Sequence, residues 1–319
     1  MFIKLKTLFA LLLLISLHSL SAQNEDAGST GFNTLKLIYG ARSMAMGAGG
    51  IGIPANHEGL NQNPATILRA EQQSLSSTFM DHLVGSGGGR ISYVYPKNIY
   101  EAYAAAISYW NSGAMDRTEL SSTGELVETG ETFGAQSMVA EVSASRFVSP
   151  ALDIGASLKF IYDSIDGYSA SAAMVDLGAL HHTANPKIKV GLALRNVGFQ
   201  TSYYTDSKFK EHLPFTYGAG LSMQMQENLL GAIDVGKANG ENITLKLGME
   251  YGISDAFTLR GGFRSNAGDY QMGGIAGYTS GISLGLGWKI RSWNLDYAVA
   301  SYGDLGISNQ LSLRYNLSN

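Results

Sequence analysis

From Ser74 to the end of the chain, apolar and polar residues alternate with a period of two, and this alternation limits what the chain can fold into. Between Phe215 and Gln226, one parity carries Phe, Tyr, Ala, Leu and Met, and the other carries Thr, Gly, Ser and Gln. A strand with one apolar face has this period, whereas an amphipathic helix repeats every 3.6 residues. Residues 152–163, 243–251 and 282–291 follow the same rule. The region is therefore predicted to be all β.

About fourteen strands can be placed, an even number, and many have the 9–11 residues that a tilted strand needs to cross a bilayer. Short turns alternate with longer loops, which favours up-and-down antiparallel hairpins. The sequence thus predicts a transmembrane antiparallel β-barrel over residues 74–319. The expected strands lie near 74–80, 89–96, 101–113, 136–149, 152–165, 169–183, 188–200, 215–225, 229–238, 243–253, 257–266, 281–290, 293–302 and 307–317.

The non-apolar parity distinguishes a barrel from a soluble β-sandwich, which would show the same alternation. A closed sheet of fourteen strands has a lumen too wide for side chains alone to fill, so its inner face is expected to be wet and to carry both signs of charge. Only 15% of the residues are charged, against about 25% in soluble domains. The residues expected on the inner face are Glu141, Lys159, Lys189, Arg195, Lys246, Glu250, Arg260, Arg264, Lys289 and Arg314.

The first residues resemble a cleavable secretory signal. Lys4 and Lys6 precede an apolar run from Leu8 to Leu17, and small residues end at Ala22. Residues 1–22 are therefore predicted to be a signal peptide, and the protein is expected in the outer membrane of a Gram-negative bacterium with lipid as its surroundings. Its 26 acidic residues outnumber its 22 basic ones, which makes nucleic acid a poor partner.

Residues 23–73 do not alternate and are rich in glycine and small residues. Inside a wide barrel, such a segment can fold into the lumen as a hatch or plug, where its backbone meets a polar wall; an exposed periplasmic tail is the alternative. Gly47, Gly49 and Gly52 match the dinucleotide pattern G-x-G-x-x-G. Because Pro54 follows closely and no strand–helix–strand unit surrounds them, we interpret these glycines as turn residues.

No constellation in the sequence predicts catalysis. The chain has six His and no Cys, and the neighbours His181 and His182 would point to opposite faces of a strand. No nucleophile elbow of the type G-x-S-x-G is found. We therefore expect a non-enzyme with no cofactor and no metal.

Several motifs in order along the chain are similar to those of the PorV/PorQ family (UPF0164-like) of outer-membrane proteins, which belongs to the FadL-like barrels. GSTGFNTLKLIYGARSMAMGAGGIGI is followed by LNQNPATI, and then by GLALRNVG, LPFTYGAGLS, LKLGMEYGISDAFTLRGGFRSN, LDYAVASYGDLG and QLSLRY. The resemblance implies a fourteen-stranded barrel with an N-terminal hatch. The hatch motif would comprise Arg42, Gly47, Gly49, Asn61, Asn63, Pro64 and Ala65.

The resemblance also implies a role in the type IX secretion of Bacteroidota-like bacteria, with secretion components and secreted cargo proteins as partners. Two alternatives remain. A FadL-like channel would take up hydrophobic small molecules past the hatch and through the barrel wall, and a structural barrel would do neither. Apolar lumen-facing side chains beneath the hatch would favour the channel, and a uniformly polar lumen would count against it.

Overall fold

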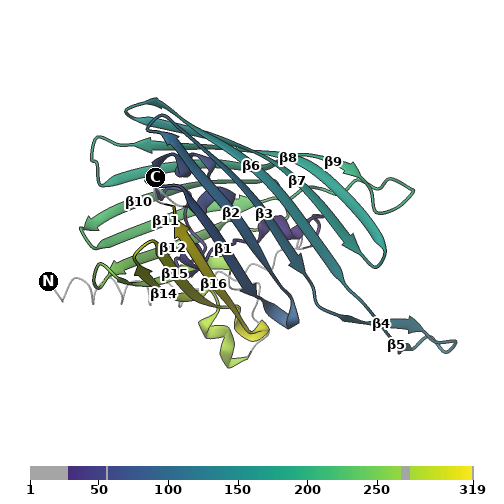
Figure 1. Cartoon of the computed structure of the whole chain (residues 1–319). Coiled ribbons are helices and arrows are strands. Elements are labelled where there is room, and N and C mark those ends of the chain that lie inside the picture. Colours follow the sequence, from purple (N-terminus) through teal and green to yellow (C-terminus); the bar gives the residue numbers. More distant parts are fainter. Residues whose placement is uncertain (1–27, 55–56, 267–273, 318–319) are drawn as a thin grey trace.

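The computed structural model describes residues 28–54, 57–266 and 274–317, so the predicted signal peptide lies outside the described residues. Fourteen of the described strands form a closed antiparallel barrel, which confirms the predicted fold class (Figure 1). They are β1 (Ser74–Asp81), β2 (Gly87–Asn98), β3 (Glu101–Asn111), β6 (Ala135–Ser149), β7 (Leu152–Ile165), β8 (Tyr168–His182), β9 (Ile188–Ser202), β10 (Thr216–Gln226), β11 (Leu229–Ala238), β12 (Thr244–Gly252), β13 (Phe257–Arg264), β14 (Ile282–Ile290), β15 (Trp293–Ser301) and β16 (Ile307–Asn316).

Consecutive barrel strands are neighbours, and the first and last strands close the sheet. Ser74 of β1 lies opposite Asn316 of β16, and Asp81 lies opposite Asn309. Short turns, such as Pro150-Ala151 between β6 and β7, gather at the end where β1 begins, which we call the short-turn end. The longer connections gather at the other end, the long-loop end. They include the 3-10 turns η4 (Leu83–Gly85), η6 (Ile275–Thr279) and η7 (Gly303–Leu305).

The alternation in sequence becomes two faces of the barrel wall. Along β7, Leu158 is 62% exposed, whereas the next residue, Lys159, is 6% exposed. The outward face is thus apolar, and the inward face carries Ser, Gly and charged residues, as expected for a lipid-facing barrel with a polar lumen. Of the ion pairs on the inner face, Arg90–Glu141 and Lys159–Asp176 are buried.

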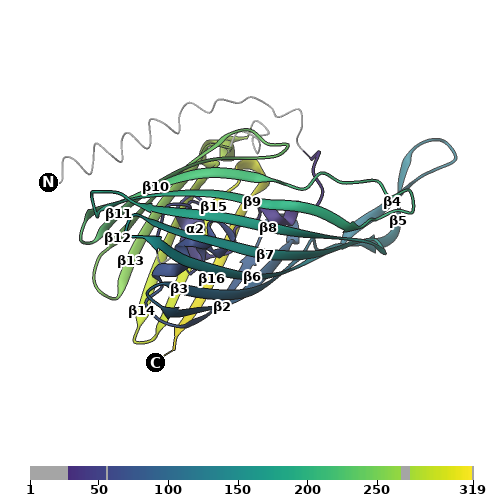
Figure 2. The same cartoon turned by 90° about the horizontal axis from the view of Figure 1, so that it is seen from above.

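A two-stranded ribbon that the sequence did not predict extends from the long-loop end (Figure 2). It consists of β4 (Met115–Leu120) and β5 (Leu126–Phe133), which pair with each other and form a sheet separate from the barrel. Arg117 forms an ion pair with Asp166 of the β7–β8 turn and ties the base of the ribbon to the rim. Its residues are mostly exposed on both faces, so the period-two signal of a half-buried strand is missing.

The N-terminal segment occupies the lumen as short helical turns, which we call the plug (residues 28–54 and 57–73). It contains η1 (Asn33–Lys36), α2 (Ala41–Ala45), η2 (Gly59–Asn61) and η3 (Pro64–Arg69). Gly31 donates to the carbonyl of His212 in the β9–β10 loop, so this segment enters at the long-loop end. It reaches β1 at the short-turn end and therefore spans the lumen. None of the helices in the described ranges is both long enough and apolar enough to cross a membrane.

Candidate functional site

The plug is held to the barrel wall by an ion-pair row at Arg42. This arginine lies in α2 and donates through Nε and Nη2 to both carboxylate oxygens of Glu250, at 2.7 and 2.8 Å. Arg260 donates to Glu250 at 2.6 Å and to Asp296 at 2.6 Å. A bidentate guanidinium–carboxylate contact fixes the relative orientation of the two groups as well as the distance between them. The row therefore sets how α2 lies against β12, β13 and β15.

The glycine-rich loop of the plug approaches the wall closely through its backbone. Gly47 has φ of +71° and donates to the Ser283 hydroxyl at 3.1 Å, and a Cβ on it would lie 2.5 Å from the carbonyl oxygen of Phe263. Gly49 is next to Gly50, whose N–H donates to Asp234 Oδ2 at 2.6 Å; Ile51 N–H donates to the same oxygen at 3.0 Å. Close approach thus requires glycine at position 47, as the turn interpretation predicts.

Asn63 is the most heavily bonded residue of the Asn-Pro-Ala motif, and it is fully buried. Its Nδ2 donates to the carbonyls of Ile51 and Ala179 at 2.7 and 3.0 Å, and its Oδ1 accepts from Ala65 N–H at 3.1 Å, which caps η3. Pro64 occupies the first turn of η3, where a missing N–H has no cost, and its carbonyl accepts from Ser145 Oγ. This motif joins two parts of the plug to the wall.

Asn61 lies at the end of η2, and its backbone carbonyl accepts from Arg195 Nη1 of β9 at 2.7 Å. All seven hatch residues expected from the sequence thus belong to the plug. They do not converge on one point: Arg42 faces β12, whereas Asn63, Pro64 and Ala65 face β6 to β8. Their shared property is contact with the wall.

Two tethers were not anticipated from the sequence. Arg69 of η3 donates to both oxygens of Asp153 at 2.7 Å, and His182 Nε2 lies 2.6 Å from Asp153 Oδ2. Asp234 anchors the glycine loop as described above. No local pattern distinguishes Asp153 or Asp234 from other inward-facing acids, because their partners lie 84 and 184 residues away.

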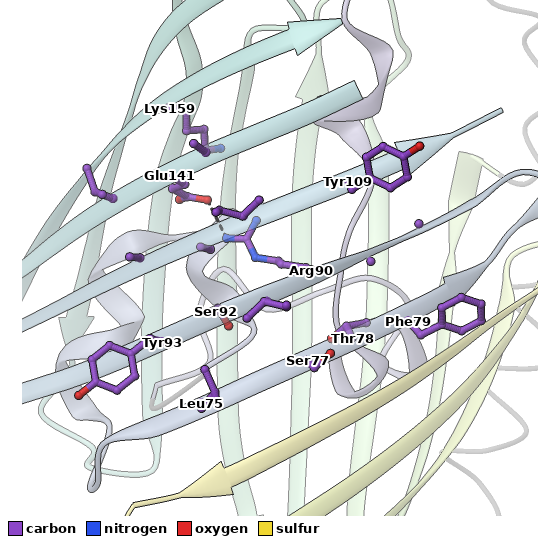
Figure 3. A pocket seen from close by; sticks show the side chains of 18 of the residues that line it. Leu75, Ser77, Thr78, Phe79, Arg90, Ser92, Tyr93, Tyr109, Glu141 and Lys159 are labelled. Carbon is purple, nitrogen blue, oxygen red and sulfur yellow. Dashed lines mark hydrogen bonds and ion pairs between the residues drawn. The ribbon is translucent and has the colours of Figure 1, made fainter. Parts of the chain in front are cut away.

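The outer face of the barrel carries a depression of about 1210 Å³ over β1, β2, β3, β6 and β7, which we call the wall depression. Small outward residues form its floor, among them Gly89, Ala105 and Ala140. Larger ones border it. Figure 3 shows Phe79, Tyr93 and Tyr109 around its edge, with Arg90 and Glu141 between them. The outward lining is mostly apolar.

The wall beneath this depression is thin because β2 begins with three glycines. A Cβ on Gly87 or Gly89 would lie 2.8 Å from a carbonyl oxygen of β1, and one on Gly88 would overlap the carbonyl oxygen of Tyr109. The backbone alone separates the outer face from the lumen there. On the lumen side, Arg90 binds Glu141 at 2.7 Å and Ser108 Oγ at 2.9 Å. The polar lining of the lumen thus comes close to an apolar outer surface.

Two Ser–His contacts are unsuited to nucleophilic catalysis. His57 Nδ1 lies 2.8 Å from Ser74 Oγ, and His82 Nδ1 lies 3.0 Å from Ser308 Oγ. Burial, followed by the charges of Arg314 and Arg42, lowers the pKa of His57 to about 3. Burial and Arg264 lower the pKa of His82 to about 4. A general base needs a pKa near the working pH, so neither imidazole would accept a proton from its serine. In the described ranges, no group of three or more His, Asp or Glu could hold a metal.

The low pKa of His57 predicts a pH-dependent plug. Unfolding exposes the imidazole and restores its usual pKa of 6.5, so between pH 6.5 and about 3 the unfolded state binds the extra proton. Stability should then fall with falling pH by up to about 1.4 kcal/mol per unit. We expect His57→Gln to flatten this slope in thermal unfolding measured from pH 7 to pH 4.5. Parallel slopes for the two proteins would contradict the expectation.

These features define a class: a closed fourteen-stranded barrel of the outer-membrane type, whose lumen is plugged by its own N-terminal segment. No protein-family model and no curated protein matches the sequence. Solved structures do match. The toluene transporter TbuX of Ralstonia pickettii is 16% identical, with a TM-score of 0.64 over 88% of this chain and 98% of that chain.

Two further neighbours have the same architecture. The toluene transporter TodX of P. putida is 12% identical, with a TM-score of 0.61 over 88% of this chain and 99% of that chain. A FadL homologue of Pseudomonas aeruginosa is 12% identical, with a TM-score of 0.57 over 87% and 97%. At such identities the likeness establishes a shared FadL-like fold. The structural likeness does not test membership of the PorV/PorQ family, so that membership stays a prediction from the sequence motifs.

Proposed function

We propose that the protein is a non-enzymatic outer-membrane channel for hydrophobic small molecules. In this proposal, residues 23–73 are the hatch and residues 74–319 the barrel. The observation that carries the proposal is the apolar wall depression over the glycine-only stretch of β2. A hydrophobic molecule leaving the lumen there enters lipid without crossing the polar short-turn end, and the plug blocks the straight path. The structural neighbours named as toluene transporters support this choice of cargo.

Filling the wall depression should slow uptake. Ala105 faces outward at the centre of β3 and lines the depression, so Ala105→Trp would place an indole over its floor. Ala219 of β10 also faces outward but lies outside the depression, which makes Ala219→Trp the matched control. We expect at least a fivefold lower initial rate of labelled toluene uptake by a Gram-negative host for the first variant only.

The amount of folded barrel in the outer membrane must be equal in the three strains. Heat-modifiable migration of unboiled samples in gel electrophoresis measures it. Equal uptake by Ala105→Trp and the parent protein would reject a lateral route at this place. If the parent protein gives toluene uptake no faster than a host that lacks it, the proposed channel function is rejected.

Type IX secretion is the second candidate, and the β4–β5 ribbon favours it. This ribbon projects from the long-loop end with both strand edges unpaired, and Leu120, Leu126 and Val127 are more than half exposed. Unpaired edges can receive a further strand, so the ribbon suits a polypeptide partner better than a hydrocarbon.

Replacing residues 115–133 with a short Gly-Ser linker tests this candidate in the native host. If secreted proteins with a C-terminal sorting domain are the cargo, they should accumulate several-fold in the periplasm and fall at the cell surface, as measured by quantitative proteomics. If the secreted proteins keep the distribution of the parent strain while the altered barrel is present at its normal level, the ribbon is not needed for secretion.

A further inference from the structure

A second cavity lies inside the barrel, between the plug and the inner face of β12 to β16, near the short-turn end. It has a volume of about 570 Å³, within the range of small-molecule sites, and we call it the inner chamber. It shares none of its lining with the wall depression. Charged and polar side chains dominate its lining, so the chamber suits a hydrophilic molecule. Nothing in the proposed channel function uses it.

The carboxylates deepest in this chamber are already bound. Glu250 accepts from Arg42 and Arg260, and Asp296 accepts from Arg260. Gly287 leaves the room for this row, since a Cβ there would lie 2.7 Å from Arg260 Nη1 and Asp296 Oδ1. A cation entering the chamber would have to compete with two guanidinium groups for these oxygens. The chamber is therefore poorly suited to cations.

Arg314 of β16 continues the row, but no carboxylate binds it. Within the described residues it makes no hydrogen bond or ion pair to the protein, and its Nε is buried without a partner. Asp296 and Glu58 attract it only at longer range. Its cross-strand neighbour is Asn294, whose Nδ2 is also buried without a partner. A buried donor without an acceptor costs about 1–3 kcal/mol. Two adjacent donors thus lack an acceptor.

The groups around these donors favour an anion of modest charge. Lys289 and Arg291 line the mouth of the chamber, where they add positive potential, and Glu71 and Asp255 line the same mouth. The neutral imidazole of His57 lies between this chamber and Ser74 and adds no charge. A ligand with a single carboxylate balances the unpaired guanidinium of Arg314, whereas a polyanion would meet the two acids at the mouth.

We propose that the inner chamber binds a small hydrophilic organic acid, whose carboxylate accepts from the Arg314 guanidinium. The acid enters from the short-turn end, because the plug separates the chamber from the long-loop end. Hydroxyl groups on the body of the ligand suit the polar lining. The site does not depend on the hydrocarbon route, and either could exist without the other.

The test is a calorimetric titration of gluconate into the purified full-length protein in detergent, with glucose as the uncharged control. We expect saturable gluconate binding and no glucose binding. Arg314→Gln should weaken gluconate binding at least tenfold. Lys97→Gln is the matched control, because it removes one positive charge from an exposed site in the last, turn-proximal part of β2, at the same end but outside the chamber lining.

A second variant keeps the test decisive if Arg314→Gln does not fold. Asn294→Asp places a carboxylate beside Arg314, where it takes the place of the ligand, so we expect it to abolish binding while the barrel remains folded. Absence of gluconate binding to the parent protein, equal binding of glucose, or undiminished binding by either chamber variant would overturn the proposal. Toluene uptake by these variants should stay at the parent rate.

Discussion

Gly262→Val is expected to displace the plug from the inner wall of the barrel, whereas the same change at the neighbouring Gly261 should leave the plug in place. A Cβ at position 262 would overlap Gly47 N and lie 2.8 Å from the carbonyl oxygen of Ala45. Position 261 faces outward, where the nearest atom is Leu284 Cδ2 at 3.8 Å. Two backbones cannot separate locally without moving the whole loop of the plug. Overpacking of this kind costs about 1–3 kcal/mol, and more where backbone must give way.

Single-channel recording in planar bilayers provides the readout. The parent protein and Gly261→Val should be nearly closed to ions, because the plug spans the lumen. Gly262→Val should open to a conductance at least tenfold higher, and its plug should become sensitive to added protease. A closed Gly262→Val channel would mean that the wall, and not the plug, adjusts to the valine.

Removal of Glu250 should have the second-largest effect. Glu250→Ala deletes the carboxylate that Arg42 and Arg260 share, so Arg42 loses its ion-pair partner while Arg260 keeps Asp296. Breaking a buried ion pair by removing one partner costs about 3–5 kcal/mol. Because Arg42 and Glu250 side chains are 20% and 18% exposed, we expect the lower end of that range, about 3 kcal/mol.

A double-mutant cycle with Arg42→Ala isolates the plug–wall contact from the rest of the row. Denaturant unfolding in detergent measures each variant. The pair Lys97–Glu101, with side chains 49% and 26% exposed, is the comparison, and its loss should cost less than about 1 kcal/mol. A coupling energy near zero between Arg42 and Glu250 would show that the row orders the wall without holding the plug.

The barrel could be predicted from the sequence because each of its strands has one face in lipid. Such a strand alternates strictly, and the fourteen expected strands agree with the observed ones to within about two residues at most ends. The β4–β5 ribbon escaped detection for the same reason, since solvent surrounds both of its faces. Apolar and polar residues alternate only where the two faces of a strand lie in different environments. A strand with the same environment on both faces therefore shows no alternation.

The site could be predicted only as a segment. Glycine content and the lack of alternation indicated a plug, and the family resemblance placed Asn63, Pro64 and Ala65 in it. The cap of Asn63 on η3 was not predicted. The wall partners Glu250, Asp234 and Asp153 could not be assigned, because closure of the barrel creates those contacts. The wall depression could not be predicted from the sequence either, because its floor depends on which small residues of five strands become neighbours in the barrel.

The plug also forms hydrogen bonds with β16, the strand that closes the barrel against β1. Gln310 of β16 accepts from Gly40 N–H at 2.8 Å and donates to the Ile38 carbonyl at 2.8 Å, and Ser312 Oγ accepts from Ala41 N–H at 2.9 Å. The same strand completes the sheet by pairing with β1, the strand directly after the plug. The N-terminal segment therefore offers hydrogen-bond partners to β16 at the seam, and we expect closure of the barrel and burial of the plug to occur together during biogenesis.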